Sequence, residues 1–189
     1  MSRLTAFLDA NVLYSAGLRD LFMRLALRGL FRPRWSDMVH EKWMAAIQRH
    51  FPDITRQQLV RTRYLMDLHA KDSLVTGFEY RIEMLQLPDP DDRHVLAAAI
   101  HTKASIIVTQ DIKDFPQSVL TPHDIEVQHP DELVRQLFLR DPGAVVAAAR
   151  QHRANLDNPP RSVGDYLAAL ERQGLTQTVA ILRSYAAVL

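Results

Sequence analysis

The chain has 189 residues, of which 47% are hydrophobic and 24% charged, with a formal net charge of +1 and no cysteine. This composition is typical of a globular protein with one full domain and a modest appendage. The absence of cysteine excludes disulfides, thiolate metal sites and cysteine nucleophiles. No apolar run approaches the roughly 20 residues of a membrane span, and the N-terminal segment has no signal-peptide pattern. We therefore expect a cytoplasmic protein that does not bind a membrane.

Charge is unevenly distributed along the chain. Between Arg19 and Arg63 there are ten Lys and Arg against four Asp and Glu, whereas between Tyr64 and Asp141 there are seven against fourteen. A basic first half beside an acidic second half could place a phosphate-binding rim next to a carboxylate cluster. The alternative is that both halves carry ordinary solvated helix faces.

The first half of the chain combines short apolar runs with helical periodicity. In chain order, the pattern predicts a buried strand at Leu4–Leu8, an amphipathic helix at Leu18–Leu30, a brief strand at Arg34–Trp35, a helix at Asp37–His50 with Ser36 as its N-cap, and a helix from Thr55 to about His69.

The next segment returns to strands. Val75–Pro88 is irregular or short-stranded, and Asp89-Pro90 opens a helix that continues to about His101. Ala104–Thr109 is rich in β-branched residues and predicts a strand, and a short strand near Ile125–Val127 follows. Strands that alternate with helices in this way indicate an α/β fold with a mostly parallel sheet.

The character of the chain changes after His129. Four short helices are predicted, at Pro130–Arg140, Pro142–Ala154, Val163–Arg172 and Thr176–Val188. We therefore divide the chain into an α/β domain, residues 1–129, and a helical C-terminal extension, residues 130–189. The apolar stripes of the extension should be packed, with buried positions at Leu167, Leu170, Ile181, Leu182 and Tyr185.

Acidic residues stand where the carboxyl ends of the predicted strands should meet. Asp9 ends the first strand and Asp111 follows the strand at Ala104–Thr109, and such ends gather function in parallel sheets. Asp92 lies in the first turn of its helix, and Glu41 lies one turn into the helix after Ser36. Carboxylates gathered at close range need a cation in order to stay ionised. Oxygen-only ligands suit Mg²⁺ or Mn²⁺, which support hydrolysis of phosphodiesters.

Each acid also has a simpler explanation. Asp9 could cap a helix or form a turn, Glu41 could be a solvated helix residue, and Asp92 could interact with the helix dipole. Asp111 and Asp114 could merely shape a loop. Only the convergence of these residues on one site would separate the two interpretations.

Four segments together resemble a known family. Residues 7–14, 35–43, 87–99 and 107–115 read FLDANVLY, WSDMVHEKW, LPDPDDRHVLAAA and IVTQDIKDF. In this order and at this spacing they resemble the PIN-domain nucleases, and within them the VapC-type toxins of bacterial toxin–antitoxin pairs. The resemblance covers about residues 4–128, and the helical tail exceeds a minimal toxin of this type.

The resemblance implies a three-layer α/β/α fold and cleavage of RNA that depends on Mg²⁺ or Mn²⁺. It also implies an antitoxin that blocks the site, and frequent homodimers. Asp9 and Asp92 would be the direct metal ligands, and Glu41 and Asp111 would position water or a second ion. Some relatives take the last acid from the position of Asp114, so both Asp111 and Asp114 stay candidates.

The basic residues complete the sequence-based hypothesis. We expect Arg34 and Lys42 to bind substrate, within a basic rim around the acidic pocket drawn from Arg19, Arg24, Arg28, Arg32, Arg34, Lys42 and Arg49. Trp35 or Trp43 could add a stacking surface for bases, unless they belong to the core.

Two other functions compete with the toxin. One is a housekeeping nuclease that processes RNA or DNA on the same carboxylates. The other is a non-catalytic module, such as an RNA-binding scaffold or a phosphoacceptor receiver. A receiver would need paired acids at the end of the first strand, and Asp9 is followed by Ala10 and Asn11. A degenerate scaffold should have lost carboxylates, whereas every position is filled here.

Overall fold

The protein is built around a central parallel sheet. The structure is a computed structural model and describes residues 4–156 and 159–189. In the described residues the sheet has five strands in the order β3-β2-β1-β4-β5, and all four pairings are parallel. The strands are β1 (Thr5–Leu8), β2 (Arg32–Ser36), β3 (Leu74–Val75), β4 (Ile106–Val108) and β5 (Glu126–Gln128). The predicted α/β class with a mostly parallel sheet is confirmed.

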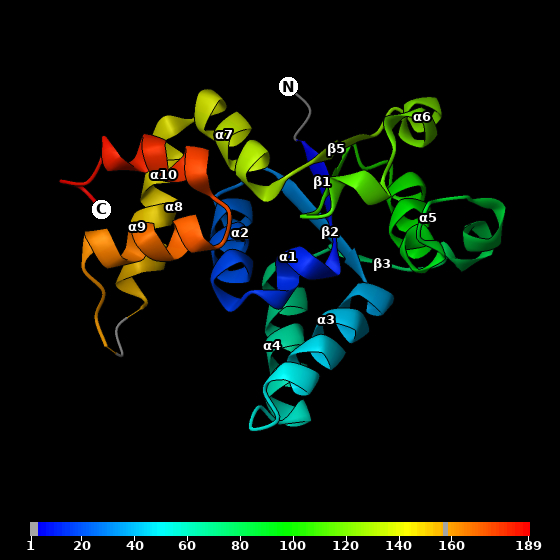
Figure 1. Cartoon of the computed structure of the whole chain (residues 1–189), viewed down its shortest axis with the longest axis horizontal. Helices are drawn as coiled ribbons and strands as arrows, with labels where there is room; N and C mark the ends of the chain where they lie inside the picture. Colours follow the sequence, from blue (N-terminus) through cyan, green and yellow to red (C-terminus); the bar gives the residue numbers. More distant parts are fainter. Residues whose placement is uncertain (1–3, 157–158) are drawn as a thin grey trace.

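Helices cover the sheet on both sides, with α1 and α2 on one side of the strands in Figure 1 and α5 on the other. The helices of this part are α1 (Ala10–Tyr14), α2 (Ala16–Leu27), α3 (Asp37–His50), α4 (Arg56–His69), α5 (Arg93–His101) and α6 (Gln117–Leu120). Short 3₁₀ turns lie at Glu79–Met84, Pro90–Asp92, Ile112–Asp114 and Thr121–His123. The result is the expected three-layer α/β/α arrangement.

The rest of the described chain is helical. Its helices are α7 (Pro130–Arg140), α8 (Pro142–Ala154), α9 (Val163–Arg172) and α10 (Thr176–Arg183), drawn from yellow to red in Figure 1. Helix α8 packs against α2, and α10 packs against α7 and α9. Leu167, Leu170 and Leu182 are buried, whereas Ile181 and Tyr185 are half-buried. The extension therefore packs its apolar stripes, as expected, and shares one hydrophobic core with the sheet.

Local signals account for most of the helix boundaries. The Ser36 hydroxyl accepts a hydrogen bond from the Val39 amide and starts α3, and Thr55 caps α4 within a capping box. Proline stands at the first position of both α7 and α8, where its missing amide hydrogen costs nothing.

The predicted helices need correction at several places. The helix predicted at Leu18–Leu30 spans Ala16–Leu27. The helix predicted from Asp89 begins as a 3₁₀ turn, and α5 starts only at Arg93. The last helix ends at Arg183 rather than Val188. Helices α1 and α6 were not predicted, because their five and four residues are too few to show helical periodicity. No helix among the described residues is long and apolar enough to cross a bilayer.

Candidate active site

The sheet reverses its winding direction between β1 and β4. From β1 the chain adds β2 and β3 on one side, and β4 and β5 then follow on the other. Leu8 pairs with Val108, and the amide of Asp9 donates to the Val108 carbonyl over 3.0 Å. The residues that follow both strands therefore share the crevice at which parallel α/β sheets bind ligands.

Asp9 lies at this crevice and is only 4% exposed. Its Oδ1 accepts a hydrogen bond from the Ala10 amide (2.6 Å), and its Oδ2 accepts one from the Thr109 hydroxyl (2.8 Å). Burial raises the pKa of Asp9 and the charge of Asp92 adds to the shift, although the two hydrogen bonds and Lys42 oppose it. Asp9 is therefore a carboxylate whose negative charge is poorly solvated, and a nearby cation would stabilise it.

Asp92 is buried at the end of the 3₁₀ turn before α5 and is 8% exposed. Its Oδ1 accepts a hydrogen bond from Lys42 Nζ at 2.7 Å. Partial burial acts to lower the pKa of Lys42. The hydrogen bond to Asp92 and the negative charges of Asp92, Asp9 and Asp89 outweigh this effect, so the pKa is raised. One ammonium group thus offsets part of the charge of the two carboxylates of Asp9 and Asp92.

Asp111 is connected to this pair through two polar side chains. Asn11 Nδ2 donates to Thr109 Oγ1 (2.9 Å) and to Asp111 Oδ2 (3.1 Å), and the Asp111 amide donates back to Thr109 Oγ1 (3.1 Å). No such contact joins Asp114 to the group in the described residues; its backbone amide bonds only to the Asp111 carbonyl in the 3₁₀ turn. The geometry favours Asp111 over Asp114 as the acid nearest to Asp9.

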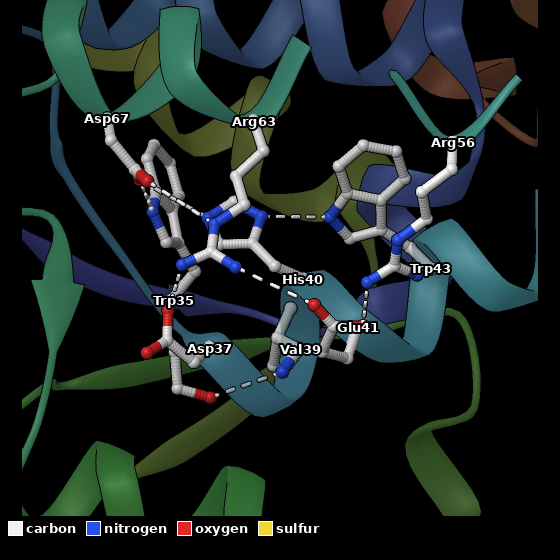
Figure 2. A network of polar contacts seen from close by, with 10 residues as sticks. Trp35, Asp37, Val39, His40, Glu41, Trp43, Arg56, Arg63 and Asp67 are labelled. Atoms are coloured by element: carbon white, nitrogen blue, oxygen red, sulfur yellow. Dashed lines mark hydrogen bonds and ion pairs between the residues drawn. The ribbon is translucent and has the colours of Figure 1, made fainter. Parts of the chain in front are cut away.

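Glu41 takes part in a different set of contacts. Its half-exposed carboxylate pairs with Arg56 at 2.6 Å and with Arg63 at 3.7 Å, both from α4 (Figure 2). Arg63 also pairs with Asp37. In this structure Glu41 therefore lies within an ion-pair network between α3 and α4 and makes no hydrogen bond to Asp9 or Asp92.

The tryptophans belong to a buried polar chain in the same network (Figure 2). Trp43 Nε1 donates to His40 Nδ1 (3.0 Å), and His40 Nε2 and Trp35 Nε1 both contact Asp67 Oδ1 (3.2 and 2.8 Å). Burial lowers the pKa of His40, so the ring is neutral and donates its Nε2 hydrogen to Asp67. Trp35 and Trp43 are 0% and 1% exposed. Neither can offer a stacking surface, so that expectation is wrong.

Most of the expected basic rim lies elsewhere. Arg34 Nε donates to Thr102 Oγ1 at 3.0 Å, and its Nη1 donates to the Asp72 carbonyl. Both partners precede strands, so Arg34 lies at the amino edge of the sheet and not beside Asp9. It lines a cavity of about 590 Å³ there, together with Arg28, Arg32 and Lys71. Helices α2 and α4 also end in this cavity, and cations commonly gather near such carbonyl ends.

The other basic residues on α2 have structural partners. Arg19 lies over the ring of Trp43, with its guanidinium carbon 4.8 Å from the ring centroid, and burial lowers its pKa to about 10. Arg24 pairs with Asp20 at 3.0 Å. Of the seven residues expected at the rim, only Lys42 and Arg49 line a cavity that adjoins the acidic site.

The three acids Asp9, Asp92 and Asp111 therefore surround one crevice, but they do not form a compact cage. Among the described residues, no group of three or more His, Asp or Glu side chains is arranged so that it could hold a metal ion. Mg²⁺, however, commonly binds one or two carboxylates, keeps several waters and takes further ligands from substrate phosphates. The buried Asp9 and Asp92 carboxylates, which already attract the Lys42 ammonium, fit such an ion.

Two residues of the crevice were missed from the sequence. From the sequence, Asn11 bears only on the exclusion of a phosphoacceptor receiver, and Thr109 only on the end of a predicted strand. Each lies two residues from a candidate acid, Asn11 after Asp9 and Thr109 before Asp111, and this position is the signal that could have identified them.

Comparison with known proteins supports the assignment by family. The PIN domain family matches residues 5–113, more than half of the chain, and the VapC50 C-terminal domain matches residues 130–184. The protein described as "Putative ribonuclease VapC50" of Mycobacterium tuberculosis (strain ATCC 25618 / H37Rv) is 40% identical over 79 residues. These residues are 40% of this chain and 47% of that protein, so the chain spans about half the length of this relative.

No solved structure matches the chain. The two family matches nevertheless follow each other in the same order as the sheet and the helical extension. The chain belongs to the PIN-domain family, as a VapC-type member with a C-terminal extension.

Proposed function

We propose that the protein is a metal-dependent endoribonuclease and the toxin of a toxin–antitoxin pair. The observation that carries the proposal is the buried pair of Asp9 and Asp92 at the reversal point of the sheet, with the Lys42 ammonium against it. Family membership supports the reaction class, and the name of the similar protein supports RNA as the substrate.

Each residue of the crevice then has a role. Asp9 and Asp92 would hold Mg²⁺ or Mn²⁺, which lowers the pKa of a bound water and neutralises charge on the phosphodiester. The Thr109 hydroxyl orients Asp9, and Asn11 orients Asp111. Asp111 would accept a hydrogen bond from the attacking water, and Lys42 would contact a phosphate oxygen of the substrate.

The remaining acids enter the proposal through the family resemblance. Glu41 is assigned to the positioning of water or a second ion on the family resemblance, because its carboxylate is paired with Arg56 and Arg63 here. Asp114 is the alternative to Asp111. Family membership also leads us to propose a cognate antitoxin as partner, a homodimer and a cytoplasmic location.

The test is cleavage of labelled RNA by the purified full chain. We expect activity with Mg²⁺ or Mn²⁺ and none with EDTA. Asp9→Asn and Asp92→Asn should each slow cleavage by at least ~100-fold, because each removes charge that binds the metal. Asp37→Asn is the matched control, since Asp37 is exposed and paired with Arg63, and it should retain activity.

The same assay separates the alternatives. Metal-dependent cleavage of DNA but not RNA would favour a housekeeping nuclease, and binding of RNA without cleavage would favour a non-catalytic module. A folded Asp9→Asn variant that cleaves as fast as the parent would refute the site assignment.

A further inference from the structure

Lys42 separates two cavities at the carboxyl edge of the sheet. One, the acidic cavity, has a volume of about 510 Å³ and includes Asp37, Glu41 and Asp91 in its lining. The other, the tyrosine pocket, has a volume of about 360 Å³, and its lining includes Asn11, Tyr14, Lys42, Arg49, His50 and Gln110, with the buried Trp43 behind them. Both cavities therefore adjoin the crevice that holds Asp9 and Asp92.

The charges of the two cavities are opposite. The acidic cavity carries three carboxylates against the Lys42 ammonium, whereas the tyrosine pocket carries Lys42 and Arg49 and no carboxylate in its lining. Asp37 and Glu41 are paired with arginines of α4, so the acidic cavity repels a phosphodiester backbone mainly through Asp91, whereas the tyrosine pocket attracts it. The tyrosine pocket is therefore the side of the crevice whose charge suits the next phosphate of a nucleic acid strand.

The tyrosine pocket also contains an aromatic ring on which a nucleobase could stack. Tyr14 is half-buried, and its hydroxyl is 2.8 Å from His50 Nδ1, with the two rings edge to face at a centroid distance of 5.8 Å. This contact fixes the Tyr14 ring as one wall. Unpaired bases in RNA-binding proteins stack on such rings.

Two side-chain amides lie on the side of the pocket nearest to the acids. Asn11 Oδ1 accepts from the Gln110 amide (3.2 Å), which fixes Asn11 between the pocket and Asp111. The side-chain amide of exposed Gln110 makes no hydrogen bond to the described part of the chain, so it can both donate to and accept from a base edge.

We propose that the tyrosine pocket binds one unpaired nucleobase of the RNA, next to the cleaved phosphate, with the base on Tyr14 and a backbone phosphate on Arg49. The inference rests on the proposed ribonuclease function and assigns a base-binding subsite to it. The volume agrees, since pockets for small organic groups measure roughly 300–1,000 Å³ and this one is too small to admit a duplex.

The experiment measures binding of RNA to the full chain carrying Asp9→Asn, in Mg²⁺, so that cleavage does not interfere. The probes are short fluorescent oligoadenylate and oligouridylate strands, the same strands with one abasic position, and a blunt duplex. The variants are Tyr14→Leu, Tyr14→Phe as a matched control that keeps the ring, and Arg49→Gln.

We expect Tyr14→Leu to weaken binding of the single strands between about fivefold and about 150-fold, the range of one base–aromatic stack. Tyr14→Phe should stay within about threefold of the parent, because the stacking face is retained. A strand whose abasic position falls in the pocket should bind equally to the parent and to Tyr14→Leu. Arg49→Gln should reduce the salt dependence by about one phosphate contact.

Two results would overturn the inference alone. One is that the Asp9→Asn chain binds intact single strands equally well with and without Tyr14→Leu, provided that the Tyr14→Leu protein is folded. In that case the chain that keeps Asp9 must still show metal-dependent cleavage. The other is a blunt duplex that binds as tightly as the single strands and with the same Tyr14 dependence. A chain that neither binds nor cleaves RNA would instead refute the proposed function, and this inference with it.

Discussion

The ion pair between Lys42 and Asp92 places a cation where the proposed metal should act. The ammonium lies 2.7 Å from Asp92 Oδ1, and the negative charge of Asp9 also attracts it. Because a divalent cation and an ammonium compete for the same carboxylates, Lys42 should weaken metal binding in the absence of substrate.

Replacement of Lys42 tests this competition. We expect Lys42→Met to lower the melting temperature without metal, because it leaves the buried Asp9 and Asp92 charges uncompensated. Mg²⁺ should then raise the melting temperature by a few degrees more than in the parent, since about 1 kcal/mol corresponds to roughly 2–4 °C at this size. Lys71→Met, at the amino edge, is the control. Equal Mg²⁺-induced shifts in all three proteins would contradict the competition.

Helices α7 and α10 are joined by one buried carboxylate. Asp131, at 3% exposure, accepts from the backbone amides of Gln177 and Thr178 at 2.8 Å each, and from the Thr178 hydroxyl at 2.7 Å. It thus caps the start of α10 from another helix. Leu175 occupies the N-cap position itself, but its side chain has no atom that can accept a hydrogen bond.

We expect Asp131→Ala to reduce the free energy of unfolding by about 2–4 kcal/mol, because amides at the start of α10 lose a charged acceptor. Chemical denaturation of the full chain measures the change. Asp165→Ala in α9 is the matched control, since Asp165 is exposed, and its effect should stay below about 1 kcal/mol. A loss of equal size in both variants would argue against the capping role.

The contact between α2, α8 and α9 contains a buried histidine. His152 is 1% exposed, its Nδ1 lies 3.1 Å from the Tyr166 hydroxyl, and its Nε2 lies 3.6 Å from Asp20. Burial lowers the pKa of His152 to about 4 and outweighs the attraction of Asp20. The folded protein therefore keeps this ring neutral at neutral pH.

Acid should weaken this contact between helices. Between pH 6.5 and 4 the unfolded chain binds a proton at His152 and the folded chain does not, so stability falls as the pH falls through this window. At pH 5 the loss from this residue is roughly 2 kcal/mol. Unfolding in urea at pH 7.5 and 5.0 should show a smaller acid effect in His152→Gln than in the parent. Parallel pH dependence in both proteins would refute the assignment.

At the scale of the whole molecule, the extension covers part of the nuclease-like domain. Leu18, Leu21, Phe22 and Leu25 of α2 are buried, and α8 packs against this helix. The division at residue 129 stays a prediction about sequence organisation, but the hydrophobic core is continuous across it.

A chain that ends at residue 129 should therefore be less stable than the full chain and should associate through the uncovered face of α2. Thermal unfolding and size-exclusion chromatography measure both effects. If the chain that ends at residue 129 is monomeric and has the same melting temperature as the full chain, then the sheet does not depend on the extension for its stability.

Much of the fold could be predicted from local signals in the sequence. The bounds of α3, α7, α8 and α9 agree with the predicted ranges, because caps, prolines and apolar periodicity all act within a few residues. Asp9, Asp92 and Asp111 could be named as candidates because they follow strands or begin helices. These features depend on neighbours along the chain, which a sequence displays directly.

The tertiary structure decided what depends on neighbours in space. The strand order brought Asp9 beside Thr109 and Asp111, and the fold turned Arg34 toward the amino edge although it lies on a strand that leads to Ser36. Burial removed Trp35 and Trp43 from the surface, and ion pairs drew Glu41 toward α4. The number of charged residues in a segment cannot predict where their side chains lie. The direction of each side chain is set by packing and long-range pairing rather than by its position in the sequence.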